Sequence, residues 1–166
     1  MAGAVHAAGD SCPEPGIGDD LPADHPACLY YTGTWHYRNE RMEQAATSWS
    51  GLVGRDDLGG EYDELRTNAL NNLGYLRFYG LGLEEDKTAA IGLWREAVSL
   101  GHDESEFHLC HAYGDANEPT YNAVRARRHC RRADAIYSAL PEPDEDDRAV
   151  LEIIREYRAI VEAAAE

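Results

Sequence analysis

The chain has 166 residues, of which 43% are hydrophobic, so it is long enough and apolar enough to fold as one domain around a core. Its 31 acidic residues against 15 basic ones give a formal net charge of −16. Such a charge argues against a nucleic acid or an anionic membrane as the partner, because both require a cationic face, and no apolar run is long enough for membrane insertion.

The first 25 residues predict an irregular N-terminal arm. Residues 8–25 are rich in Gly, Pro and Asp and show no apolar period. The stretch "VHA" near the start has the Ala-x-Ala-like character of a signal-peptide end, although no apolar core precedes it. We therefore interpret residues 1–7 as a signal-peptide remnant and expect a soluble, exported protein.

From Pro26 onward the apolar pattern is helical, and the period-two alternation of a strand is absent. An imperfect first pair of helices ends in the Gly- and Asp-rich stretch 54–60. The later helices are expected at 61–79, 87–100, 103–114, 121–140 and 145–164. Gly101 stands just past one of them, where helices commonly end in glycine. The last helix carries a single apolar stripe made by Leu151, Ile154, Tyr157 and Val161.

An internal period of 36 residues relates two of these helix pairs. The matched positions are Ala69 with Ser105, Leu73 with Leu109, Gly74 with Cys110, Ala90 with Ala126, Trp94 with Cys130 and Ala97 with Ala133. Small residues at matched places let paired helices approach closely, while leucines and aromatic residues fill the layer between pairs. The sequence thus predicts an all-α fold, a short right-handed α/α solenoid of about three helical hairpins. Its expected units are 26–60, 61–101 and 102–140, followed by a capping helix within 141–166.

The segment from Ala69 to Gly101 resembles the Sel1-like repeat, a relative of the tetratricopeptide repeat. The positions on the family pattern are Ala69, Leu73, Gly74, Gly80, Gly82, Leu83, Asp86, Ala90, Ala97 and Gly101. The next unit matches more weakly through Leu109, Tyr113, Arg125, Ala126, Arg132 and Ala133, and the first keeps little beyond Gln44, Ala45 and Trp49. The resemblance implies that Gly80 and Gly82 turn the chain between two helices of a repeat, rather than cradle a phosphate.

The four cysteines form a near pair toward each end of the chain, which fits two disulfides in an oxidising compartment. Cys110 and Cys130 occupy inward-facing positions of the third hairpin, so we expect them to be joined, and Cys12 to be joined to Cys28. This favours a periplasmic or secreted protein; four reduced cysteines in a cytoplasmic protein are the alternative.

Two other groups of residues have an alternative, functional interpretation. His108 and His111 flank Cys110, and His129 precedes Cys130, a spacing that can bind zinc or copper. If Cys110 and Cys130 form a disulfide instead, His108 and His111 are surface residues, and we expect no metal and no cofactor. We expect no ligand role for His25, which lies near Cys28 in the sequence. The basic residues Arg125, Arg127, Arg128, Arg131 and Arg132 could bind an anionic group, but pairing with the acidic residues of 142–147 is preferred.

The predicted binding surface follows the helix faces that point away from the packing stripe. Its members on two successive repeats are Asn68, Asn72, Tyr75, Tyr79, Glu104, His108, His111 and Asp115. Tyr30 and Tyr37 are candidates to extend it. Tyrosine and histidine offer contact area and a hydrogen-bonding tip, and the surrounding acidic residues favour a basic or neutral protein as partner.

Three functions are compatible with these features. No motif of a serine hydrolase, zinc protease or P-loop enzyme is present, so we expect no enzyme. The resemblance implies a protein-binding module, since relatives act as adaptors in assembly, secretion and signalling. It also allows a bacterial periplasmic immunity protein that neutralises a secreted lipase-type effector. The third alternative is a metal-binding or redox protein that uses its His and Cys residues.

Overall fold

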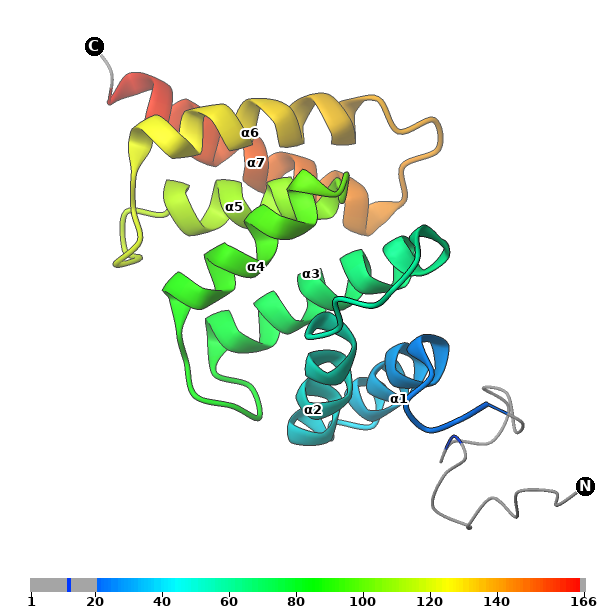
Figure 1. Ribbon diagram of the computed structural model, residues 1–166. Helices are drawn as coiled ribbons and strands as arrows, with labels where there is room; N and C mark the ends of the chain where they lie inside the picture. Colours follow the sequence, from blue (N-terminus) through cyan, green and yellow to red (C-terminus); the bar gives the residue numbers. More distant parts are fainter. Residues whose placement is uncertain (1–11, 13–20, 165–166) are drawn as a thin grey trace, which may run out of the picture. The chain divides into compact units, whose positions relative to one another are not determined.

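The computed structural model describes Cys12 and residues 21–164, and this part of the chain is all-α, without strands. Seven α-helices occur in it (Figure 1). They are α1 (Pro26–Arg38), α2 (Met42–Val53), α3 (Asp63–Tyr79), α4 (Lys87–Ser99), α5 (Glu104–Gly114), α6 (Ala123–Ser138) and α7 (Glu145–Ala163), with a 3-10 turn η1 (Gly60–Tyr62) before α3. The all-α prediction is confirmed, and the predicted helix ends differ from the observed ones by at most three residues. Among the described helices, none combines the length and apolar character that a membrane crossing requires.

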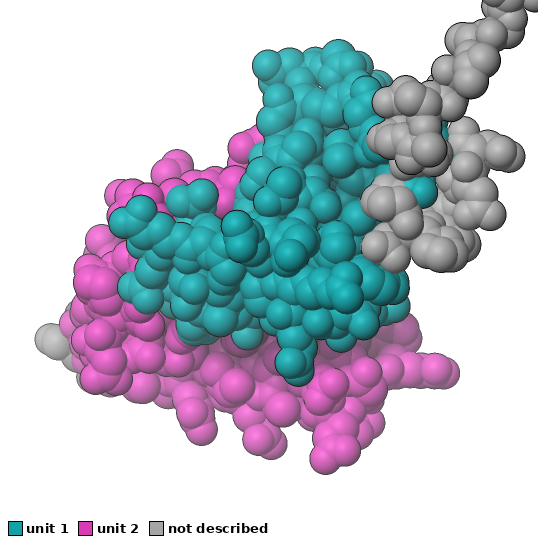
Figure 2. Space-filling model, turned by 90° about the horizontal axis from the view of Figure 1, so that it is seen from below, with its two compact units in different colours: residues 1–85 teal, residues 86–166 magenta. Residues whose placement is uncertain are grey.

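The chain divides into two compact units, residues 1–85 and 86–166, which are coloured separately in Figure 2. The division falls inside the predicted repeat 61–101, so that α3 belongs to unit 1 and α4 to unit 2. We describe each unit by itself.

Unit 1 packs α1, α2 and α3 around the indole of Trp49. Trp49 is fully buried, and its Nε1 donates a hydrogen bond to the Tyr30 carbonyl oxygen at 3.2 Å. The ring lies against the backbone of α1 at Gly33, where a Cβ atom would come within 2.5 Å of Nε1. A glycine in the middle of α1 is therefore required by the close approach of Trp49.

Gly80 and Gly82 form the turn after α3, as the resemblance implies. Both have left-handed backbone conformations, with φ of 64° and 72°, and Gly80 is the C-cap residue whose N–H bonds to the Leu76 carbonyl oxygen. Gly82 also lies directly on the first turn of α2: a Cβ atom there would overlap backbone atoms of Met42 and Glu43. The second glycine thus fixes how the turn packs on α2.

We expect Gly82→Ala to destabilise the protein by about 2 kcal/mol or more, because left-handed strain adds to an overlap with backbone that cannot rotate away. Gly101→Ala is the matched control, since Gly101 also has a positive φ of 92° but has open space where its Cβ would lie. Strain alone should then cost about 1 kcal/mol. Urea unfolding of both variants measures the difference, and equal losses would show that the contact with α2 is not made.

Unit 2 packs α5 against α4, α6 and α7, with α6 and α7 also in contact. Small residues that the 36-residue period matches, including Ala90, Ala97, Ala126 and Ala133, are fully buried. Larger side chains fill the space between the helices, above all Trp94 and Leu109. From α7, Ile154 and Val161 are fully buried, whereas Leu151 and Tyr157 of the predicted stripe remain partly exposed.

Both expected disulfides are present. Cys12 is joined to Cys28 of α1, with 5.6 Å between their Cα atoms, and Cys110 of α5 is joined to Cys130 of α6, with 4.6 Å between theirs. The second bridge is completely buried and joins α5 to α6. Because all four sulfurs are bonded in these two disulfides, none is available as a thiolate metal ligand.

Candidate binding surfaces

Tyrosines of α1 and α3 lie together on unit 1. The rings of Tyr75 and Tyr79, one turn apart on α3, have centroids 4.9 Å apart. Burial raises the pKa of Tyr37 on α1, and Tyr75, which lies close enough to interact with it, raises that pKa further. Tyr37 and Tyr79 are 37% and 42% exposed. We call Tyr37, Tyr75 and Tyr79 the tyrosine cluster; it joins three aromatic residues that the sequence analysis selected.

The other residues of α3 that were predicted to bind a partner are its two asparagines. Asn68 and Asn72 are both half-buried. Tyr30, the second candidate extension, is half-buried as well, and its ring contacts that of Tyr31 in an edge-to-face arrangement. Aromatic residues rather than amides therefore supply most of the accessible part of this predicted surface.

On α5 of unit 2 the predicted residues separate into two pairs one helical turn apart. His108 lies 3.6 Å from a carboxylate oxygen of Glu104, and His111 lies 3.9 Å from one of Asp115. The expectation that His108 is a surface residue is wrong, because only 9% of it is exposed and its ring stacks on Trp94 at 4.8 Å. His108 contributes to packing, and Glu104 is the exposed member of its pair.

His111 belongs to a group of residues that could hold a cation. One ligand atom from each of His111, Asp115 and Glu118 lies within 4.8 Å of the others. Burial lowers the pKa of His111 despite the two nearby carboxylates, which keeps the imidazole neutral at pH 7. The Lys87 ammonium group already occupies one side of the group, 2.5 Å from a carboxylate oxygen of Glu118. The Glu118 carboxylate is thus already paired with a cation of the protein itself.

A buried carboxylate in unit 2, Glu106, was missed by the sequence analysis. Only 4% of Glu106 is exposed; His129 Nδ1 donates to its Oε2 at 2.6 Å, and Arg132 donates to its Oε1 at 3.0 Å. Burial opposes ionisation, but these two partners outweigh it, and the pKa of Glu106 is lowered. Helical spacing could have shown this position, because Glu106 shares one face of α5 with Leu109, Cys110 and Tyr113.

The low pKa of Glu106 predicts an acid-dependent contribution to stability. A carboxyl group with a lowered pKa in the folded state stabilises the fold fully above its ordinary value of 4.5, and loses this effect as the pH falls through the folded value. We expect Glu106→Gln to reduce the free energy of unfolding at pH 7 by about 2 kcal/mol, since it removes a buried charged hydrogen-bond partner. The deficit should shrink as the pH falls below 4.5.

Denaturant unfolding of Glu106→Gln and the unmodified protein between pH 3 and pH 7 measures this dependence. Glu104→Gln is the control, because Glu104 lies on the same helix with 55% of its side chain exposed. A deficit of the same size at every pH would contradict the assignment of a lowered pKa to Glu106.

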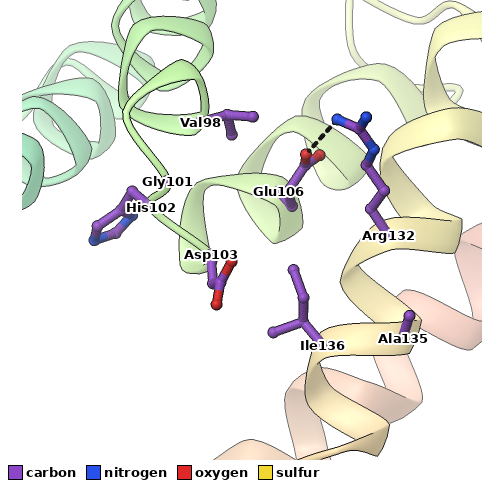
Figure 3. Close-up of a pocket in the computed structure, with 8 residues that line it drawn as sticks. All are labelled: Val98, Gly101, His102, Asp103, Glu106, Arg132, Ala135 and Ile136. Atoms are coloured by element: carbon purple, nitrogen blue, oxygen red, sulfur yellow. Dashed lines mark hydrogen bonds and ion pairs between the residues drawn. The ribbon is translucent and has the colours of Figure 1, made fainter.

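Beside this carboxylate is a pocket of about 340 Å³ (Figure 3). Val98, Ala135 and Ile136 form its apolar part, and Asp103, Glu106 and Arg132 its charged part. Figure 3 shows the Arg132 guanidinium group directed at Glu106, while the ring of His102 is turned away from this pair. The arginine of this pocket, Arg132, is therefore already paired with a carboxylate of the protein itself.

The arginines of α6 are paired differently from the prediction. Arg131 bonds to Glu162 of α7 at 3.0 Å and Arg132 to Glu106, while Arg127 donates to the Val161 carbonyl oxygen. None of these partners belongs to the acidic segment 142–147, so that preferred pairing is wrong. The acidic partners come from α5 and the end of α7 instead.

Comparison with known proteins identifies one repeat. Residues 67–102 match the family model of the Sel1 repeat, which supports the resemblance over α3 and α4. A crystal structure of a Sel1 repeat protein from Oxalobacter formigenes is similar at 15% identity and a TM-score of 0.37, over 79% of this chain and 71% of that one. No curated protein sequence matches the chain.

Proposed function

We propose, from the premise that residues 67–102 form a Sel1 repeat, that this chain is a non-catalytic module that binds another protein. Repeats of this kind mediate contacts between proteins. The observation that carries the proposal is the tyrosine cluster: the rings of Tyr75 and Tyr79 contact each other on α3, and Tyr37 of α1 is near enough to Tyr75 to interact with it electrostatically. Tyr37 and Tyr79 are exposed and Tyr75 is half-buried. Tyrosines supply contact area and a hydrogen-bonding tip, and they are enriched among the residues that dominate binding energy.

The charge of the chain supports a partner with a basic or neutral contact surface. A protein of net charge −16 repels acidic partners and accelerates encounters with basic ones. Uncharged tyrosines at the point of contact avoid the cost of burying carboxylates when the partner binds. The proposal therefore separates two roles, in which acidic residues guide the encounter and the tyrosine cluster holds the partner.

Two disulfides support an oxidising compartment, such as the periplasm or the exterior of the cell. In such a compartment an acidic exported adaptor and an acidic inhibitor of a secreted effector share the same surface chemistry. The gene beside this one distinguishes them: a neighbouring gene for a secreted toxin indicates an immunity protein, whereas a neighbouring assembly or secretion gene indicates an adaptor.

Site-specific photo-cross-linking in the source cells tests the proposal and captures the partner in the same step. A benzophenone amino acid replaces Tyr79 in one variant and Tyr121 in the control, because these tyrosines have similar exposures of 42% and 38% but lie in different units. We expect a discrete cross-linked protein from position 79 and none from position 121. Cross-linking from position 121 alone would place the partner on the wrong unit and contradict the proposal.

A further inference from the structure

A second pocket of unit 2, of about 300 Å³, is lined by basic rather than acidic residues, which is unexpected in such an acidic chain. Its lining includes two arginines, Arg95 and Arg125, and no acidic residue, although acidic residues outnumber basic ones by 31 to 15 in the sequence. Thr88, Tyr113, Ile91 and Pro119 are the other lining residues that matter here. The charged atoms at this pocket are therefore all cationic.

Neither guanidinium group is neutralised within the described part of the chain. Arg131, Arg132, Arg155 and Arg158 each pair with a carboxylate. Arg125 instead lies 5.5 Å from the ring centre of Tyr113 and donates to its hydroxyl oxygen at 3.4 Å. Arg95 takes part in none of the ion pairs formed among residues 21–164. Both arginines are exposed and line one pocket without an acidic residue, so an anion that enters the pocket can reach both guanidinium groups.

Tyr113 holds one of these cations in place. The phenol is only 3% exposed, and on its ring His129 is stacked, with centroids 5.8 Å apart. His129 is in turn fixed by its hydrogen bond to the buried Glu106. Because the Tyr113 oxygen accepts from Arg125, its own proton remains for another acceptor.

We propose that this pocket is a binding site for an oxyanion, the phosphate or carboxylate group of a small molecule, held between the guanidinium groups of Arg95 and Arg125. Guanidinium groups present paired N–H donors whose geometry matches both anions. The hydroxyl groups of Tyr113 and Thr88 add donors, and Ile91 and Pro119 provide apolar contact for the part of the ligand that carries the anion. The site differs from the pocket of Figure 3, where Arg132 is paired internally.

Titration of the intact, oxidised protein with inorganic phosphate, and separately with succinate, tests the site by amide chemical shifts at constant ionic strength. We expect saturable shifts at residues of this pocket with at least one of the two anions, and the stronger ligand identifies the phosphate or the carboxylate as the natural group. Arg95→Gln and Arg125→Gln should each weaken binding about tenfold or more, as expected for loss of a charge-assisted hydrogen bond.

Arg131→Gln is the control, because it removes the same charge from α6 at a residue whose partner is Glu162. Its affinity should be unchanged, and Arg125→Lys, which keeps the charge but not the paired donors, should bind with intermediate affinity. Shifts that do not saturate with either anion, or an equal loss in Arg131→Gln, would overturn the proposal. The cross-linking experiment at Tyr79 is unaffected by this result, so the two proposals fail independently.

Discussion

Removal of residues 141–166 is expected to leave no soluble, folded monomer. The truncation takes away Ile154 and Val161, whose side chains are fully buried against the rest of unit 2. Burying each such side chain contributes about 1.5–3 kcal/mol, so losing both removes about 3–6 kcal/mol, which reaches the lower end of the usual domain stability of about 5–15 kcal/mol. The apolar surface uncovered on α5 and α6 should then cause aggregation.

Point variants of α7 make this expectation quantitative. Ile154→Ala should cost about 3 kcal/mol, whereas Ile153→Ala, next to it but 40% exposed, should change stability by less than about 0.5 kcal/mol. Size-exclusion chromatography and thermal unfolding measure both effects. A truncated protein that stays monomeric with an unchanged melting temperature would contradict the role of α7 as a cap.

Loss of the disulfide between Cys110 and Cys130 is expected to destabilise the protein by about 3 kcal/mol. The bridge joins two cysteines that are 20 residues apart in the sequence. Without the bridge, the conformational entropy of the unfolded chain increases, which lowers the free energy of unfolding by this amount. Replacement of both cysteines by alanine leaves little unfilled volume, so most of the measured loss reports the cross-link.

Guanidinium chloride unfolding of Cys110→Ala/Cys130→Ala, with and without a reducing agent, measures this contribution. In the unmodified protein the reducing agent should lower the unfolding midpoint. In the double variant the reducing agent retains only the smaller effect of opening the bridge between Cys12 and Cys28. Free thiols at Cys110 and Cys130 in an unreduced digest would show that the bridge does not form.

The fold could be predicted from the sequence mainly where a local feature determines it. Gly80 and Gly101 end helices because each adopts a left-handed conformation that other residues disfavour, and this requirement is visible in the sequence alone. The pairing of Cys110 with Cys130 followed from inward positions on two neighbouring helices, and that of Cys12 with Cys28 from proximity in the sequence. The all-α class followed from the apolar period of every long segment.

The candidate binding surfaces were less predictable because they depend on which helix covers which side chain. Surface spacing on α5 selected His108, but Trp94 stacks on it, a contact between two helices that one helix pattern cannot show. Glu106 resembles any solvent-facing acid until His129 and Arg132 are brought to it from α6. Arg131 of α6 likewise pairs with Glu162 because α7 packs against α6, which sequence proximity to 142–147 does not reveal.

The central claim, that a protein partner binds at the tyrosine cluster, is tested most directly by hydrogen exchange in the presence of the partner found by cross-linking. We expect amides of α1 and α3 around Tyr37, Tyr75 and Tyr79 to exchange more slowly in the complex, with α7 unchanged, and Tyr75→Ala to abolish this protection while Tyr121→Ala keeps it. Protection confined to α7, or protection that persists in Tyr75→Ala, would contradict the claim.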